Sequence, residues 1–592
     1  MIPAKMPDSL HIVAGLRQLD EAGYVRVFQA RKLSPRGINT LLDLSEALAA
    51  PEQIRASLTR LDWPTLRGIR VGDAAALKRV AAQQFTRPDT NPPVLLDSVA
   101  EPLAQLLPNV PDFTEFVAAD ARSGSEAARL IATTAADAIE QLDLAPRTVR
   151  RGRGGIRMSG VEVRRIAADL DLDPAVAGSL YRWLFVGGLI APLEDIWLPT
   201  VTGRDFAGRP VITRWQTLAA AWMRGLTSSA LAELCLVAAI PDPCVPFNDY
   251  VDATPTTSAI QLPGDLAARA RSAAALGLIH LDPAVNLEAP LDGVAQLTRA
   301  GALLLNDDIA AAAQTLAAEF PAEVDRVYLQ PDRTVIAPGP LKPDVEVQLR
   351  QVADLTHRAI ASEYRITEQS LTRALQAGMT ANQILALLKN ISLTGVPQPV
   401  AYLIGDLAER YGQVRVRDHG GGGTIVRALT DELADQLLVD ASLRPLRLQP
   451  GSVGLTSAVS APAVLTTLRE SRYPAILENP DGSPAESAGQ LTAEPFVAEV
   501  PPSIQSTAET LAELAARSRE NDDQVSWLRR RLELARRDRQ ALDVTIDLGG
   551  GKSRTLLLMP ISVTPQRLRA LDVDADVERT LPLRAITELS DE

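Results

Sequence analysis

The chain has 592 residues, far more than one hydrophobic core requires, so several domains are expected. Hydrophobic residues make up 46% of the chain and aromatic residues only 4%, which predicts mainly helical cores built from Ala, Leu, Val and Ile. The net charge of −13 excludes a protein that coats nucleic acid with its whole surface, although one local basic face remains compatible with it.

The cysteines, histidines and apolar runs limit the cell compartments in which the protein is expected and the metals or cofactors that it could hold. Two cysteines, Cys235 and Cys244, are too few for a disulfide scaffold of this size, which favours a cytoplasmic location. No apolar run reaches about eighteen residues, and the N-terminus lacks a signal-peptide pattern, so no membrane span is expected. The cysteines lie far apart without a nearby histidine, and the four histidines are scattered, so we expect no metal and no cofactor.

The first segment, residues 1–120, carries leucines and other apolar residues at helical spacing and predicts a helical domain. Short helices joined by short connections suit a DNA-binding or protein-binding domain, and they equally suit a plain scaffold. The composition does not decide between these interpretations.

An arginine-rich loop follows a predicted helix from Ala127 to Leu142. Five arginines fall within eleven residues, with glycines and no acid among them. Arginine binds phosphate oxygens in a fork geometry, and glycine lets the backbone approach a nucleic-acid strand. The alternative is that these arginines pair with acids of neighbouring domains. The predicted nucleic-acid-binding residues are Arg147, Arg150, Arg151, Arg153, Arg157, Arg164 and Arg165.

The elements around this loop follow the order helix, helix, helix, hairpin. Ser159-Gly-Val-Glu162 has capping-box spacing, Asp173-Pro174 begins the next helix, and Gly187-Gly188 ends it. Two β-prone runs around Glu194-Asp195 then predict a hairpin. Residues 121–205 therefore predict a winged-helix-like domain, a fold that binds DNA or other proteins.

Residues 206–320 predict a second helical domain, in which Trp215 and Trp222 share a face that favours core packing over base stacking. Residues 321–418 then predict a compact α/β module. Two β-prone runs flank a Gln330-Pro-Asp-Arg333 bend, Thr367 and Thr380 have the spacing of helix caps, and Val414 begins a closing strand.

The order of segments in this module resembles the N-terminal, non-motor domain of XPB-type DNA helicases. The rest of the chain resembles actinobacterial helicase-associated proteins that carry this module without a motor. The resemblance implies a DNA-associated factor that works with such a helicase or in DNA repair. The segments that carry it are Val327-Tyr-Leu-Gln-Pro-Asp-Arg-Thr-Val335, Glu363-Tyr-Arg-Ile-Thr367, Arg373-Ala-Leu-Gln-Ala-Gly378, Val396-Pro-Gln-Pro399 and Arg410-Tyr-Gly-Gln-Val-Arg-Val416.

The C-terminal part predicts a small α/β extension over 419–480, an exposed linker over 481–505, and a helix with a β module over 506–592. The helix carries Trp527-Leu-Arg-Arg-Arg531, a basic face that neighbouring acids balance. The final strands resemble a degenerate WYL domain, a bacterial module tied to ligand or nucleic-acid sensing. The Trp-Tyr-Leu signature is absent, so we assign no ligand residue.

The helicase resemblance raises the question of a motor. Gly549-Gly-Gly-Lys-Ser553 is a candidate phosphate-cradling loop, but the first glycine of that motif would fall at Ile546, and a strand pattern follows it. We therefore predict a hairpin turn there. Asp20-Glu-Ala-Gly23 resembles an acidic helicase box, but no β-branched run precedes it, so it is interpreted as a helix end. No catalytic triad or carboxylate pair is apparent, and no ATP hydrolysis is expected.

The sequence thus predicts a multi-domain, mainly α protein with smaller α+β modules. The expected function is that of a non-catalytic DNA-binding accessory protein associated with an XPB-type helicase or with DNA repair. Its expected partners are DNA and such a helicase or another repair or transcription protein. The alternative is a protein-interaction scaffold or transcriptional regulator that uses the winged-helix-like and WYL-like modules.

Overall fold

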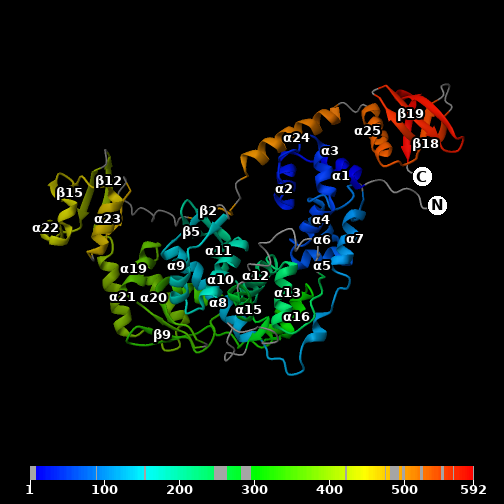
Figure 1. The fold of residues 1–592 in the computed structure, drawn as a ribbon. Helices are drawn as coiled ribbons and strands as arrows, with labels where there is room; N and C mark the ends of the chain where they lie inside the picture. The colour runs from blue at the N-terminus through cyan, green and yellow to red at the C-terminus, as the bar shows by residue number, and fades with distance from the viewer. Residues whose placement is uncertain are drawn as a thin grey trace.

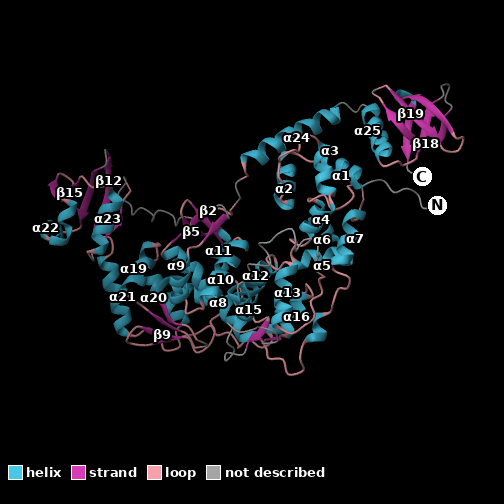
Figure 2. Ribbon diagram, in the orientation of Figure 1, coloured by secondary structure: helices cyan, strands magenta, loops and turns pink. Residues whose placement is uncertain are grey.

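The computed structural model describes residues 8–88, 90–152, 155–245, 263–281, 295–359, 361–420, 423–471, 473, 475–479, 492–496, 500–520, 524–547, 553–564 and 566–590. Helices fill the middle of the molecule, and the sheets, of two to five strands each, are small (Figures 1 and 2). Among the helices in these ranges, none combines the length and the apolar character that crossing a membrane requires. The expected mixture of helices and small sheets is confirmed.

The N-terminal segment is helical, as its apolar spacing predicts. Asp20 caps the start of a helix by accepting a hydrogen bond from the Gly23 backbone, so the Asp20-Glu-Ala-Gly23 segment opens a helix rather than ending one. The helices are α1 (Asp8–Leu16), α2 (Glu21–Arg31), α3 (Leu41–Ala49), α4 (Pro51–Leu58), α5 (Trp63–Val71), α6 (Ala74–Ala81), α7 (Asp97–Leu106) and η1 (Phe113–Phe116).

The next unit has the predicted order of helices and hairpin. Ser159 caps its second helix and Asp173 its third. A three-stranded antiparallel sheet in the order β1-β5-β4 packs beside the helices, and a separate two-stranded hairpin joins β2 to β3. The elements are α8 (Ser125–Leu144), β1 (Arg147–Thr148), β2 (Arg150–Gly152), β3 (Gly155–Arg157), α9 (Gly160–Asp169), α10 (Pro174–Val186), β4 (Ile190–Leu193), β5 (Ile196–Pro199) and α11 (Val201–Phe206).

A second hairpin unit follows, and its threonine cap makes the same contact with its hairpin as the cap of the first unit does. Thr200 and Thr298 each cap the helix after a hairpin, and each hydroxyl donates to a carbonyl at the start of the same hairpin. Trp215 is fully buried and donates to the Leu276 carbonyl, which confirms its predicted core position. The elements are α12 (Val211–Met223), α13 (Ser228–Val237), α15 (Pro263–Ala275), β6 (Ile279–Leu281), β7 (Ala295–Leu297), α16 (Arg299–Leu305) and α17 (Ile309–Ala317).

The central module has its own hydrophobic core, separate from the large core of the N-terminal half. Its antiparallel sheet has the order β10-β11-β9-β8. Thr367 and Thr380 form the predicted caps, each with a reciprocal capping box. The elements are β8 (Tyr328–Leu329), β9 (Thr334–Ile336), α18 (Pro343–Val352), β10 (Asp354–His357), β11 (Glu363–Arg365), α19 (Glu368–Gln376), α20 (Ala381–Ile391) and α21 (Gln398–Arg410).

The strand predicted to close that module belongs instead to the next unit. Val414 and Val416 pack in a further core with helices that follow them, so the boundary lies before β12 rather than at residue 418. The sheet order is β14-β15-β13-β12-β16, with only β12 and β16 parallel. The elements are β12 (Val414–Gly420), β13 (Gly423–Ala428), α22 (Asp431–Val439), η2 (Ala441–Leu446), β14 (Gln449–Gly451), β15 (Gly454–Ser457), α23 (Ala461–Glu470) and β16 (Ala475–Leu477).

The segment expected to be an exposed linker is partly packed. Ala493 is only 3% exposed and donates its backbone N–H to the Pro199 carbonyl of the first hairpin unit. Phe496 lies 5.6 Å from Phe185, measured between ring centroids. Helix α24 (Pro502–Glu520) then returns to cover α2 and α3, with its alanines and leucines in the N-terminal core (Figure 1). Residues 481–491 and 497–499 of the predicted linker lie outside the described residues.

The C-terminal unit is a five-stranded antiparallel sheet with one helix against it. Leu542–Asp547 pairs with the strand that begins at Ser553, which confirms the predicted hairpin. Arg531 is buried and donates to the Leu589 carbonyl, so this arginine belongs to the unit's core. The elements are α25 (Gln524–Arg537), β17 (Leu542–Asp547), β18 (Ser553–Val563), β19 (Arg567–Asp572), β20 (Val577–Pro582), η3 (Leu583–Ala585) and β21 (Ile586–Ser590).

Candidate nucleic-acid interface

Part of the arginine-rich loop forms two paired strands in the first hairpin unit, which comprises α8 to α11. Strand β2 pairs antiparallel with β3, and the register sets Arg150 opposite Arg157 and Arg151 opposite Ile156. Arg153 lies outside the described residues, and so do the side chains of the other three arginines of this hairpin. The backbone therefore brings Arg150, Arg151 and Arg157 onto one short two-stranded segment, which we call the arginine ribbon.

Arg147 differs from the arginines of the ribbon because it forms ion pairs with two carboxylates of α9. Its guanidinium lies 2.5 Å from the Asp169 carboxylate and 3.9 Å from that of Glu162, and its side chain is only 12% exposed. This pairing fixes the start of the hairpin against both ends of α9. In this arrangement Arg147 positions the ribbon rather than facing solvent.

Helix α9 adds positive charge next to the ribbon. Arg164 and Arg165 are both exposed on this helix, and Arg165 also pairs with Glu162 at 3.3 Å. The predicted Ser159 cap is present, but the Glu162 carboxylate faces arginines, and the described contacts do not include its return bond to the Ser159 backbone. The structure thus places two exposed arginines beside the ribbon.

The third helix of the unit, α10, is covered. In a helix-turn-helix protein this helix would enter the major groove. Here it packs against α12 and α15 of the neighbouring unit, and the Ser179 and Ser272 hydroxyls are 2.6 Å apart across that contact. The helix that would read bases in a helix-turn-helix protein is therefore occupied by a contact within the chain.

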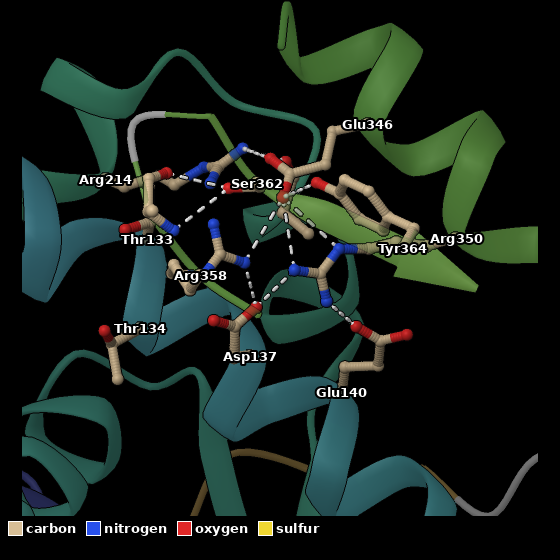
Figure 3. Close-up of polar contacts among 12 residues, drawn as sticks. Thr133, Thr134, Asp137, Glu140, Arg214, Glu346, Arg350, Arg358, Ser362 and Tyr364 are labelled. Carbon is tan, nitrogen blue, oxygen red and sulfur yellow. Dashed lines mark hydrogen bonds and ion pairs between the residues drawn. The ribbon is translucent and has the colours of Figure 1, made fainter. Parts of the chain in front are cut away.

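A cluster of buried charges, which the sequence did not lead us to expect, joins the central module to the N-terminal half (Figure 3). Asp137 and Glu140 extend from α8, Arg214 from α12, and Glu346 and Arg350 from α18. Arg350 donates to both Asp137 and Glu140, and Arg358 donates to Asp137 at 2.5 Å. We call this group the junction cluster; its members are Asp137, Glu140, Arg214, Glu346, Arg350 and Arg358.

Glu346 is the centre of the junction cluster. It accepts hydrogen bonds from Arg350, from Arg358 at 3.3 Å and from the Tyr364 hydroxyl at 3.2 Å. Burial alone would raise the pKa of Glu346, but the charges of Arg350, Arg358 and Arg214 outweigh it and hold that pKa at about 2. Glu346 therefore stays ionised at neutral pH, in a group of three guanidinium groups and three carboxylates.

The cluster gave no recognisable sequence signal. Asp137 and Glu140 share a helix face at i, i+3, and Glu346 and Arg350 share one at i, i+4, but such pairs are common on exposed helices. What makes them a cluster is the packing of α18 against helices far away in the sequence. Only the tertiary contact reveals it.

Three other kinds of site were considered in the described residues: a metal site, a reactive cysteine and a phosphate-cradling loop. Within them, no group of three or more His, Cys, Asp and Glu side chains is placed to hold a metal ion. Cys235 and Cys244 are buried, and burial raises the pKa of each thiol to about 12, which disfavours the reactive thiolate at neutral pH. The glycines of the Gly549-Gly-Gly-Lys-Ser553 segment lie outside the described residues, between two paired strands.

Comparison with known proteins locates a similarity in the central part of the chain. A family model described as "Helicase conserved C-terminal domain" matches residues 327–450. The general transcription and DNA repair factor IIH helicase/translocase subunit XPB of Antonospora locustae is 35% identical over 85 residues. This segment of the chain is therefore similar to helicases. That match spans 14% of this chain and only 12% of the length of the relative, so it concerns one segment of each.

The helicase-related segment runs across two structural units. It begins at the first strand of the four-stranded sheet and ends within the following sheet, at β14. It therefore includes Glu346, Arg350 and Arg358 of the junction cluster. The arginine ribbon lies outside the matched residues.

Proposed function

We propose that this protein is a non-catalytic DNA-binding accessory factor that acts beside an XPB-type helicase or in DNA repair. The observation that carries the proposal is the helicase-related segment at residues 327–450, together with the 35% identity over 85 residues to a DNA repair helicase subunit. In this proposal the four-stranded unit corresponds to the non-motor domain of such helicases. Residues 121–205 act as a winged-helix-like domain, and the last sheet acts as a WYL-like module.

The topology supports the lack of a motor. A nucleotide-cradling loop lies between a strand and a following helix, where the helix N-terminus meets the phosphates. The two sheets to which the helicase-related segment contributes are antiparallel apart from the pair of β12 with β16, and β16 lies beyond that segment. The strands on either side of Gly549–Ser553 pair with each other, so a strand follows where that site needs a helix.

A second candidate function is protein interaction, as a scaffold or transcriptional regulator. The covered helix α10 favours it, because the element that usually reads bases is used to contact another part of the chain. The net charge of −13 also favours protein partners over extensive DNA contact.

The test is equilibrium binding of the full chain to intact, forked and damaged duplexes, with a nucleotide-hydrolysis assay on the same preparation. We expect binding that weakens with salt, and no DNA-stimulated hydrolysis. Hydrolysis that Lys552→Ala abolishes would contradict the non-catalytic part. Absence of binding to all three duplexes, together with capture of a helicase or polymerase after nuclease treatment, would favour the scaffold.

A further inference from the structure

A cavity of about 370 Å³ lies between the two hairpin units, in the helical middle of the molecule (Figure 1). Helix α10 of the first unit and helices α12, α13 and α15 of the second unit line it. The hydroxyls of Ser179 and Ser272, which meet between α10 and α15, belong to its wall. Cavities between helices, with volumes of about 300–1,000 Å³, are usual sites for small molecules. The contact that covers α10 therefore also forms a space of the size that a small molecule occupies.

Small residues create this space. Ala221 of α12, Ala230 of α13 and Ala268 of α15 line the cavity, together with Gly225 in the connection between α12 and α13. A Cβ built on Gly225 would lie 3.6 Å from Nη2 of Arg182, so the guanidinium of Arg182 lies beside this part of the wall. A larger side chain at one of the alanines would fill the space that a ligand needs.

The charge of the wall is positive. Arg182 and Arg269 line the cavity, and neither Asp nor Glu is among its described lining residues. Arg269 is neutralised, because its Nε lies 2.7 Å from the carboxylate of Glu233. Arg182 is exposed and makes neither a hydrogen bond nor an ion pair within the part of the chain that the structure describes. One guanidinium group at the cavity is thus available to an anion.

Two tryptophan side chains add flat apolar surfaces to the wall. Trp183 is only 4% exposed and Trp222 is half-buried, and both line the cavity. Neither indole N–H donates a hydrogen bond within the described ranges, although a buried indole N–H usually has a partner. An acceptor atom on a bound ring would supply that partner. The cavity therefore combines apolar surfaces for a flat ring with donors for its polar atoms.

We propose that this cavity binds a small aromatic anion, a flat ring that carries a phosphate or carboxylate group and has about the size of a nucleoside monophosphate. The fork of Arg182 donates to the anionic group, the two indole rings pack against the flat ring, and an indole N–H donates to an acceptor on it. A DNA duplex is too large to enter the cavity, so this site is separate from the proposed DNA contact and does not depend on it.

Two substitutions test the two parts of the site. Arg182→Gln removes the unpaired guanidinium from an exposed position, so the fold should be retained while the affinity falls about tenfold or more. Ala268→Leu fills the cavity from a half-buried position on α15 and should abolish binding. Arg271→Gln is the matched control, because Arg271 lies on the same helix, is 38% exposed and is not among the described lining residues.

The experiment is isothermal titration calorimetry of the full chain with small probes, together with thermal unfolding of each variant. The probes are adenosine monophosphate, indole-3-acetate, adenosine and inorganic phosphate. We expect at least one of the two aromatic anions to bind and to raise the unfolding temperature of the wild type. Adenosine and inorganic phosphate, which each lack one part of the ligand, should bind at least about tenfold more weakly. The aromatic anion that binds more tightly shows whether the site prefers phosphate or carboxylate.

The outcomes separate the proposed site from an empty packing defect. Loss of affinity in folded Arg182→Gln, with Arg271→Gln unchanged, would support the site even if Ala268→Leu failed to fold. Absence of binding by all probes at millimolar concentration would overturn the inference. So would adenosine or phosphate binding as tightly as the aromatic anions, or folded Arg182→Gln and Ala268→Leu that both bind as the wild type does.

Discussion

At the scale of single residues, Glu346 shows how a buried charge can join two parts of a chain. A buried carboxylate without partners would protonate, because desolvation disfavours the charged form. Here Arg350, Arg358 and Arg214 surround it, and Arg350 also reaches two acids on α8. Breaking one member of such a group leaves uncompensated buried charge, which costs more than the intact group contributes.

The pH dependence of stability tests Glu346. Its pKa is lowered from 4.5 to about 2, so its ionised form contributes stability that is fully present above pH 4.5. That contribution, about 3 kcal/mol at most, is lost as the pH falls from 4.5 through 2. We expect the wild type to lose resistance to urea in this window more than Glu346→Gln does. Parallel pH profiles for the two proteins would show that the carboxylate is not held ionised by the arginines.

At the scale of elements, the two hairpin units share a close contact between a glycine of the helix and a backbone carbonyl of the hairpin. Gly203 and Gly301 each lie so close to a backbone carbonyl, of Leu189 and Leu278, that an added Cβ would overlap it. The two threonine caps beside them bond to the starts of the same hairpins. The hairpin and the following helix are therefore locked together by backbone proximity.

Gly203→Ala tests this lock. The added methyl group meets backbone rather than a flexible side chain, so we expect a loss of about 1–3 kcal/mol in the free energy of unfolding. Gly405→Ala is the matched control, because its Cβ would find open space within helix α21, where alanine is the better helix former. Equal urea midpoints for Gly203→Ala and the wild type would contradict the lock.

Local signals predicted most of the elements, whereas long-range contacts were not predictable. The caps at Ser159, Thr367 and Thr380 and the hairpin at Ser553 were readable because each depends on neighbours within a few residues. The packed segment around Ala493 looked like a linker because its composition is polar and proline-rich. Its burial comes from a hairpin almost three hundred residues earlier, which no local pattern encodes.

The candidate sites divide in the same way. The arginine ribbon was visible because its charges are close together in sequence. The junction cluster was not visible, since packing brings its members together from separate elements. The two hairpin units also share a Gly-Leu-Ile start and a Thr-x-x-Gly end, at Gly188 and Thr200 and again at Gly277 and Thr298. That repeat was a usable signal in the sequence, and it did not enter the predictions.

At the scale of the whole molecule, the central module and the N-terminal half have separate apolar cores and meet through the charges of the junction cluster. Contacts between domains that are polar rather than broadly apolar favour relative motion. Helix α24 instead makes an apolar contact, since it buries alanines and leucines in the N-terminal core. The N-terminal half is thus covered by α24 through apolar packing, and it is joined to the helicase-related segment by the ion pairs of the junction cluster.

The central proposal is that this chain, which is similar to helicases over residues 327–450, binds DNA through its arginine ribbon. The most direct test is the salt dependence of duplex affinity for the wild type and for the variant Arg150→Glu, Arg151→Glu and Arg153→Glu. The account predicts weaker binding by the variant at every salt concentration and a slope reduced by about 1 for each phosphate that the variant no longer neutralises. The same affinity and the same slope for both proteins would contradict it.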